Sequence, residues 1–91
     1  MGYQKAQIVR SLRGRDSGCL FCVMGVEEDG WLLLADGKRR RVDRPKRKRG
    51  KHVRAAGDWD HPVMEKLRAG QPVRDRELRA ALAAFREEME V

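Results

Sequence analysis

The chain has 91 residues, a formal net charge of +7, and 38% charged against 41% apolar residues. A chain of this length builds one small domain with a single modest core, which argues against a large enclosed active site. No apolar run approaches the length of a membrane-spanning helix and the N-terminus lacks a signal core, so we expect a cytoplasmic protein with reduced cysteines.

The first predicted strand covers residues 5–12, where Ala6, Ile8 and Leu12 share one face at a spacing of two. A turn is expected at residues 13–18, which contain two glycines, a serine and an aspartate. This loop also holds two arginines, and exposed backbone N–H groups beside arginine suit a phosphate. An ordinary hairpin loop with solvated arginines is the competing interpretation.

Residues 19–26 are apolar throughout, and their length and Phe/Val content favour a strand over a helix. Both faces of this strand are apolar, so both require cover. Gly25 is a candidate position for a bulge. The strand sends two sets of side chains to opposite faces: Leu20, Cys22, Met24 and Val26 on one, and Cys19, Phe21 and Val23 on the other.

Cys19 and Cys22 have the spacing of a metal or redox motif. Residues three apart in a strand point to opposite faces, which a chelate cannot use. No second pair of cysteines exists, and His52 and His61 are too far apart in sequence for a zinc finger. We therefore interpret both cysteines as core residues and expect no metal and no cofactor.

A polar turn at residues 27–30 leads to a third strand at residues 31–35. The dipeptide at residues 36–37 is Asp-Gly, which between two strand-like runs predicts a hairpin. The expected partner strand covers residues 39–44 and ends at Pro45, because proline cannot donate to a ladder. Within that strand, Val42 is predicted to face the core.

The basic run, residues 38–51, contains ten Lys or Arg and one acidic residue, so it carries +9 and the rest of the chain sums to −2. Such a concentration of charge repels itself and favours an anionic partner. Residues 46–51 have no apolar side chain, which predicts a loop or a mobile arm. Residues 52–54 are expected to close the sheet as a brief fifth strand.

The composition changes at a predicted linker, residues 55–58. Residues 1–57 carry a net charge of +9 and residues 58–91 a net charge of −2. A first helix is predicted to begin near Asp60 and Pro62 and to end at Gly70.

A second helix is predicted from Asp75, as N-cap, to about Met89. Because an isolated helix of this length is marginal in water, we expect its apolar stripe to cover the outer face of the sheet. The stripe consists of Leu78, Ala81, Leu82, Phe85 and Met89.

The acidic residues and the two histidines form no catalytic constellation, so the sequence does not predict an enzyme. The basic run has three other interpretations: a disordered tail, a localisation signal and a solubilising face. Its internal position beside the predicted hairpin favours nucleic-acid binding over these. A protein-interaction module that uses the barrel and the C-terminal helix stripe is the alternative function.

Residues 13–26, with Ile8 to Ser11 before them and Leu32 to Arg41 after them, resemble a KOW motif. Over about residues 5–54 the chain is similar to KOW-containing large-subunit ribosomal proteins of archaea and eukaryotes, and to short bacterial relatives of these. The resemblance implies an SH3-like barrel of about five strands. It also implies binding of RNA, mostly ribosomal RNA, through the loop at residues 13–18 and neighbouring basic loops.

The predicted fold is mainly β: an SH3-like barrel with a basic arm at residues 1–57, and two short helices at 58–91 that pack on it. The predicted function is ribosome-associated RNA binding by phosphate backbone and shape, with no membrane and no small-molecule substrate. Ribosomal proteins are further possible partners. Which RNA is bound, and whether the protein is a permanent ribosomal component or an assembly or rescue factor, stays open. The candidate RNA-binding residues are Arg13, Gly14, Arg15, Gly18, Lys38, Arg39, Arg40, Arg41, Arg44, Lys46, Arg47, Lys48, Arg49, Lys51 and His52.

Overall fold

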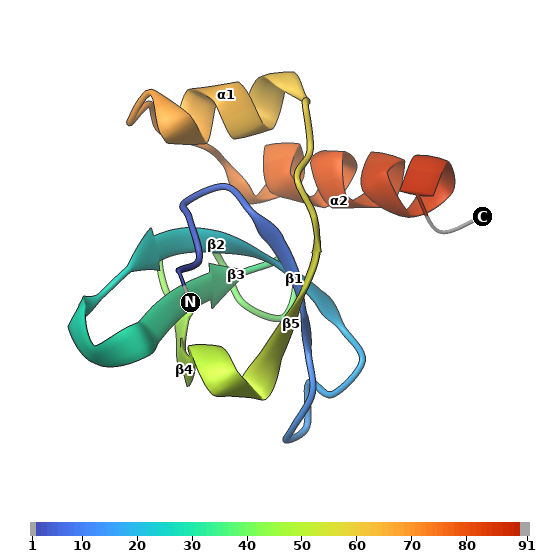
Figure 1. Ribbon diagram of the computed structural model, residues 1–91. Helices are drawn as coiled ribbons and strands as arrows, with labels where there is room; N and C mark the ends of the chain where they lie inside the picture. The colour runs from blue at the N-terminus through green and yellow to red at the C-terminus, as the bar shows by residue number, and fades with distance from the viewer. Residues whose placement is uncertain (1, 90–91) are drawn as a thin grey trace.

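The computed structural model describes residues 2–89 and shows a strongly bent antiparallel sheet with two helices on one side (Figure 1). The five strands lie in the order β4-β3-β2-β1-β5. The strands are β1 (Ile8–Ser11), β2 (Leu20–Val26), β3 (Trp31–Ala35), β4 (Lys46–Arg49) and β5 (Val53–Gly57). Two 3₁₀ turns, η1 (Glu28–Gly30) and η2 (Gly50–His52), precede β3 and β5, and the helices are α1 (Pro62–Arg68) and α2 (Asp75–Met89).

The predicted class, mainly β with two C-terminal helices, is confirmed. The predicted barrel is not closed, because the described residues form no ladder between the edge strands β4 and β5. Only the short turn η2 joins these two strands along the chain. No helix within residues 2–89 has the length and apolar character needed to cross a membrane.

Both faces of the sheet are covered, as the apolar character of β2 predicted. An inner cluster fills the concave side of the sheet and contains Val9, Phe21, Val23, Leu32, Leu34 and Val53. An outer cluster joins Ile8, Leu20, Cys22 and Ala35 to the two helices. The predicted bulge is also present, since the register between β2 and β3 shifts between Val23 and Gly25.

The two cysteines lie on opposite faces of β2. Cys22 is buried in the outer cluster, where burial raises the pKa of its thiol to about 12, and Cys19 packs against the inner cluster. A thiol held in its neutral form is a poor nucleophile and a poor metal ligand. The described residues contain no group of three or more His, Cys, Asp or Glu placed to hold a metal ion.

Helix α2 lies across the outer face of the sheet, above β1 and β2 (Figure 1). Four members of its stripe, Leu78, Ala81, Leu82 and Phe85, are buried in the outer cluster. Met89, in contrast, is 56% exposed, so the stripe ends one turn earlier than predicted.

The predicted strand at residues 39–44 is wrong. The Asp36 carboxylate accepts hydrogen bonds from the backbone N–H groups of Lys38 and Arg40, both at 2.9 Å, and this closes a compact turn. A side chain that binds the backbone in this way competes with ladder formation. Val42 does not enter the inner cluster; it packs at the edge of the outer one, and its N–H donates to Asp75 Oδ1 at 2.8 Å.

The partner strand of β3 is instead β4, which begins directly after Pro45. The predicted loop or mobile arm at residues 46–51 is therefore also wrong: residues 46–49 are an edge strand and the rest belongs to η2. Residues 46–49 are all cationic, so they show no alternation of apolar and polar residues that would indicate a strand. They form one because pairing with the apolar strand β3 outweighs their low intrinsic strand propensity.

Several element boundaries also differ from prediction. Strand β1 is shorter, because Ala6 adopts a φ of 75° and Leu12 is exposed. Residues 55–57 of the predicted linker belong to β5. His61, not Asp60, caps α1, where its Nδ1 accepts from the N–H of Val63 at 3.2 Å. Asp75 is the first residue of α2 rather than its N-cap.

Candidate nucleic-acid interface

The loop at residues 13–18 connects β1 to β2 and is held in a tight shape by its own backbone. Gly14 and Gly18 have φ angles of 84° and 86°, which residues with a Cβ adopt only at a cost. The N–H of Gly18 donates to the carbonyl of Ser11 at 2.8 Å, and Arg10 donates to the Gly18 carbonyl at 2.5 Å. The two candidate glycines thus shape the loop that carries Arg13 and Arg15.

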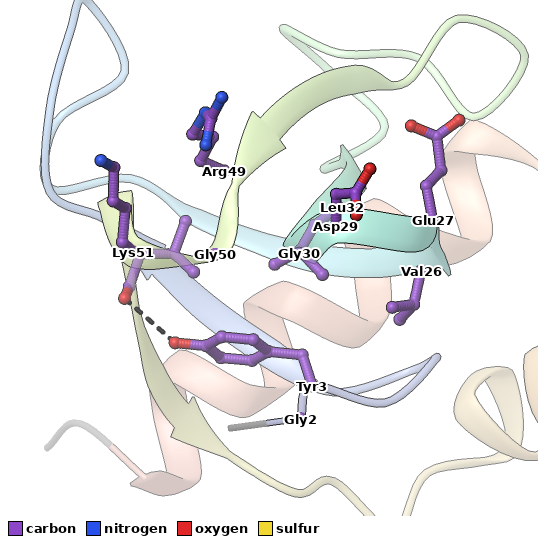
Figure 2. Close-up of a pocket in the computed structure, with 11 residues that line it drawn as sticks. Gly2, Tyr3, Val26, Glu27, Asp29, Gly30, Leu32, Arg49, Gly50 and Lys51 are labelled. Atoms are coloured by element: carbon purple, nitrogen blue, oxygen red, sulfur yellow. Dashed lines mark hydrogen bonds between the residues drawn. The ribbon is translucent and has the colours of Figure 1, made fainter.

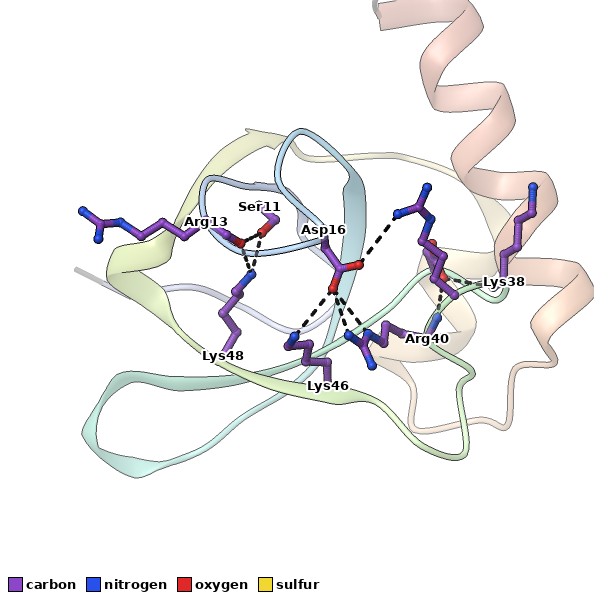
Figure 3. Close-up of polar contacts among 9 residues, drawn as sticks. Ser11, Arg13, Asp16, Lys38, Arg40, Lys46 and Lys48 are labelled. Carbon is purple, nitrogen blue, oxygen red and sulfur yellow. Dashed lines mark hydrogen bonds and ion pairs between the residues drawn. The ribbon is translucent and has the colours of Figure 1, made fainter.

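Asp16, in the middle of this loop, is buried, and its carboxylate faces the basic run (Figure 3). It accepts a hydrogen bond from Arg40 Nη2 at 3.1 Å and pairs with Lys46 Nζ at 3.7 Å and Arg39 Nη1 at 3.9 Å. Burial alone would raise the pKa of Asp16, but the hydrogen bond and charge of Arg40, with the charge of Lys46, lower it. Asp16 is therefore a carboxylate anchor for three of the candidate cations.

Lys48 is the second tie between the loop and the basic run (Figure 3). It lies opposite Leu32 in the ladder, and its side chain is buried. Its ammonium donates to Ser11 Oγ at 2.6 Å and to the Arg13 carbonyl at 2.7 Å. Burial, with the positive charge of Lys46, lowers the pKa of Lys48. Lys48 was predicted to touch RNA, but its ammonium is occupied inside the protein.

Arg47 and Arg49 alternate with Lys46 and Lys48 along β4 and therefore point to the other side of the strand. There they stack on Trp31 of β3. Their guanidinium carbons lie 4.2 Å and 4.7 Å from the centroid of the Trp31 ring. Arg47 also pairs with Glu27 at 2.6 Å. Stacking of guanidinium on indole fixes the arginine planes and leaves their edges able to donate.

The remaining candidates fall into two groups. Lys38, Arg39, Arg41 and Arg44 are exposed on the turn before β4, where Arg41 is 3.2 Å from Asp75 at the start of α2. Arg13, Arg15 and Lys51 are exposed beside the loop and η2.

The second group of cations affects the pKa of His52. Its pKa is lowered by partial burial and then by the positive charges of Arg13, Lys51, Lys48 and Arg49. Cations from the loop, from β4 and from η2 therefore gather around one imidazole.

Sequence reasoning missed Asp16, Ser11 and Trp31. The single acidic residue in a basic loop was a usable signal for Asp16. Trp31 is half-buried, and the guanidinium groups of two arginines stack on its ring. That arrangement could be foreseen only with the correct register of β4.

A comparison with protein-family models finds no family that matches the chain, and a comparison with curated proteins finds no match either.

Proposed function

We propose that this protein binds structured RNA through the phosphate backbone, with a ribosomal RNA as the first candidate. The proposal rests on two sets of contacts between the loop at residues 13–18 and the basic run. Asp16 forms ion pairs with Arg40 and with Lys46 of β4, and the Lys48 ammonium donates to Ser11 Oγ and to the Arg13 carbonyl. These contacts hold the loop that carries Arg13 and Arg15 against the strand that carries Arg47 and Arg49. The ribosomal context rests on the KOW resemblance of residues 13–26, and an RNA partner of this kind places the protein in the cytoplasm.

The proposed basic surface consists of Arg13, Arg15, Lys51, Arg47 and Arg49. These cations are of two kinds with different expected roles. Arg13, Arg15 and Lys51 are exposed and have no carboxylate partner among residues 2–89, so they are available to neutralise phosphates. Arg47 and Arg49 are oriented by Trp31, which suits planar, bidentate recognition of phosphate. Contacts of both kinds position RNA by backbone and shape rather than by base sequence.

Salt dependence tests the proposal. If about six phosphates are contacted, affinity for a ribosomal RNA hairpin should fall on the order of a thousandfold between 50 and 200 mM salt. Filter binding or fluorescence anisotropy measures this slope, and a flat response would contradict the electrostatic account.

A pair of variants that remove the same charge tests where on the protein the RNA binds. Replacing Arg13, Arg15 and Lys51 with Gln should weaken binding about tenfold or more and reduce the salt slope by about three. The control replaces three exposed arginines of the helical part, Arg74, Arg76 and Arg86, with Gln and removes the same charge. Equal losses in the two triple variants would show that only net charge matters and would contradict the proposed surface.

The alternative, a protein-interaction module that uses the barrel and the C-terminal helix stripe, has less support, because much of that stripe is buried. Leu78, Leu82 and Phe85 are each at most 1% exposed because they cover the chain's own sheet. They are therefore not free to dock on a partner.

A further inference from the structure

A pocket of about 600 Å³ lies beside the basic surface, at the end of the sheet where β2 turns into β3 (Figure 2). The N-terminal segment, the turn η1 and the turn η2 surround it. A volume of this size accommodates a small planar ligand. Since η2 continues directly from β4, the pocket shares Arg49 and Lys51 with the basic surface.

The walls of the pocket are apolar and one of them is aromatic. Leu32, Val26 and Val53 contribute aliphatic side chains. The Tyr3 ring is fixed, because its hydroxyl donates to the carbonyl of Val53 at 3.1 Å. Gly50 lets this ring approach the backbone, since a Cβ there would lie 3.2 Å from the Tyr3 ring. The result is a fixed aromatic face against a bare backbone.

The rim of the pocket is polar and its charges are separated. Arg49 and Lys51 lie on one side, and Glu27 and Asp29 lie on the other (Figure 2). Glu27 is paired with Arg47, whereas the Asp29 carboxylate has no partner among residues 2–89. Asp29 also has a φ of 63°, a conformation that non-glycine residues adopt at a cost and that often marks functional positions.

We propose that this pocket binds one unpaired nucleotide of the RNA. The base stacks on Tyr3, its phosphate lies against Arg49 and Lys51, and the Asp29 carboxylate accepts hydrogen bonds from the base edge. Guanine fits Asp29 best, because its N1–H and its amino group are adjacent donors for one carboxylate. The inference rests on the proposed RNA binding, and it adds a site that reads an unstacked base beside a surface that reads phosphates.

Two RNA probes separate the inference from the function on which it rests. One is a duplex of about 16 base pairs, and the other is the same duplex with a single bulged guanosine. Phosphate contacts contribute equally to the binding of both probes. The ratio of the two affinities therefore measures the contribution of the bulged base. At about 0.15 M salt we expect the unmodified protein to prefer the bulged probe about tenfold.

A matched pair of variants locates the effect. Val26, in the pocket, and Leu12, outside it, are 49% and 48% exposed, so a substitution at either leaves the core intact. Val26→Glu adds a negative charge to the wall and should bring the preference close to one. Leu12→Glu adds the same charge outside the pocket and should keep the tenfold preference. Asp29→Asn should reduce the preference for bulged guanosine relative to bulged uridine.

The outcomes are distinct. Equal binding of the two probes by the unmodified protein would overturn the nucleotide pocket and leave the phosphate surface standing. A preference that survives Val26→Glu, or that Leu12→Glu removes equally, would also overturn the pocket. Failure to bind either probe would overturn the proposed function and, with it, this inference.

Discussion

Asp16 contributes a buried carboxylate to a surface that is otherwise cationic. Its oxygens lie 3.1 Å from Arg40 Nη2 and 3.7 Å from Lys46 Nζ, so two segments 24 and 30 residues away converge on one loop. Without this anion, Arg40 and Lys46 would repel one another with no carboxylate between them. A residue of this kind stabilises the fold and positions the proposed interface at once.

Substitution of Asp16 tests this role. Asp16→Asn leaves the charge of Arg40 and Lys46 unpaired, and we expect a loss of about 2 kcal/mol in the free energy of unfolding, measured by urea denaturation. The control is Asp43→Asn, because Asp43 is exposed and 4.0 Å from Arg41; it should change stability by less than about 0.5 kcal/mol. Similar losses in the two variants would contradict the special role of Asp16.

The pH dependence of this stability has a definite sign. The pKa of Asp16 is lowered in the folded state, so its contribution is present above the pKa of the unfolded chain. It is lost as the pH falls through the folded pKa. Denaturation curves of the native protein and of Asp16→Asn should therefore converge in acid, and a constant difference down to about pH 2 would contradict the linkage.

His52 gives the proposed RNA binding its own pH dependence. Its pKa in the free protein is lowered by burial and by Arg13, Lys51, Lys48 and Arg49. A phosphate bound beside these cations favours the imidazolium form, so the pKa rises in the complex and affinity increases as the pH falls below about 7. Binding curves across this range measure the effect, and His52→Gln should abolish it without changing binding above about pH 8.

Among the elements, the turn at residues 36–44 is the joint between the sheet and α2. Gly37 packs on the first residue of that helix, and its carbonyl accepts from Arg79 at 2.6 Å. Asp75 in turn accepts from the N–H of Val42 and from Arg41 Nε. The sheet and the helical part are therefore tied by specific polar contacts as well as by the outer cluster.

Gly37→Ala tests how tight this joint is. Gly37 has a φ of 79°, and a Cβ there would collide with the carbonyl oxygen of Asp75. We expect strain and overpacking together to cost about 3 kcal/mol. Gly70→Ala is the control: its φ is 75° but the space around it is open, so the cost should be only about 1 kcal/mol. Thermal unfolding followed by circular dichroism measures both variants.

For the whole molecule, the distribution of charge matters more than its sum. The basic run carries +9 in a chain of +7, and seven of its ten Lys and Arg residues are exposed. Mutual repulsion among these cations opposes the compact state, and salt screens it. The protein is thus expected to gain stability from its anionic partner.

This repulsion predicts that the melting temperature rises with ionic strength. Between about 0.02 and 0.2 M sodium chloride we expect a gain on the order of 1 kcal/mol, or roughly 5 °C for a chain of this size. The triple Gln variant of Arg13, Arg15 and Lys51 should show a smaller rise, because part of the repulsion is gone. A melting temperature that falls with salt would instead indicate that internal ion pairs dominate.

Local pattern was sufficient wherever the apolar residues themselves carried the information. The alternation in β2 correctly assigned Leu20 and Cys22 to one cluster and Phe21 and Val23 to the other. The bounds of β3 at residues 31–35 and the stripe of α2 up to Phe85 were also predicted correctly. Burial of apolar side chains is the dominant favourable term, so its periodicity in sequence survives into the fold.

The basic run is where the amino-acid sequence alone was insufficient. Its composition determined that this protein concentrates positive charge, but it did not determine which cations are free. Only tertiary structure made residues 46–49 a strand, buried Lys48 and placed Arg47 and Arg49 over Trp31. The reason is physical: all these side chains have the same charge locally, and their roles are set by distant partners, Asp16, Ser11 and β3.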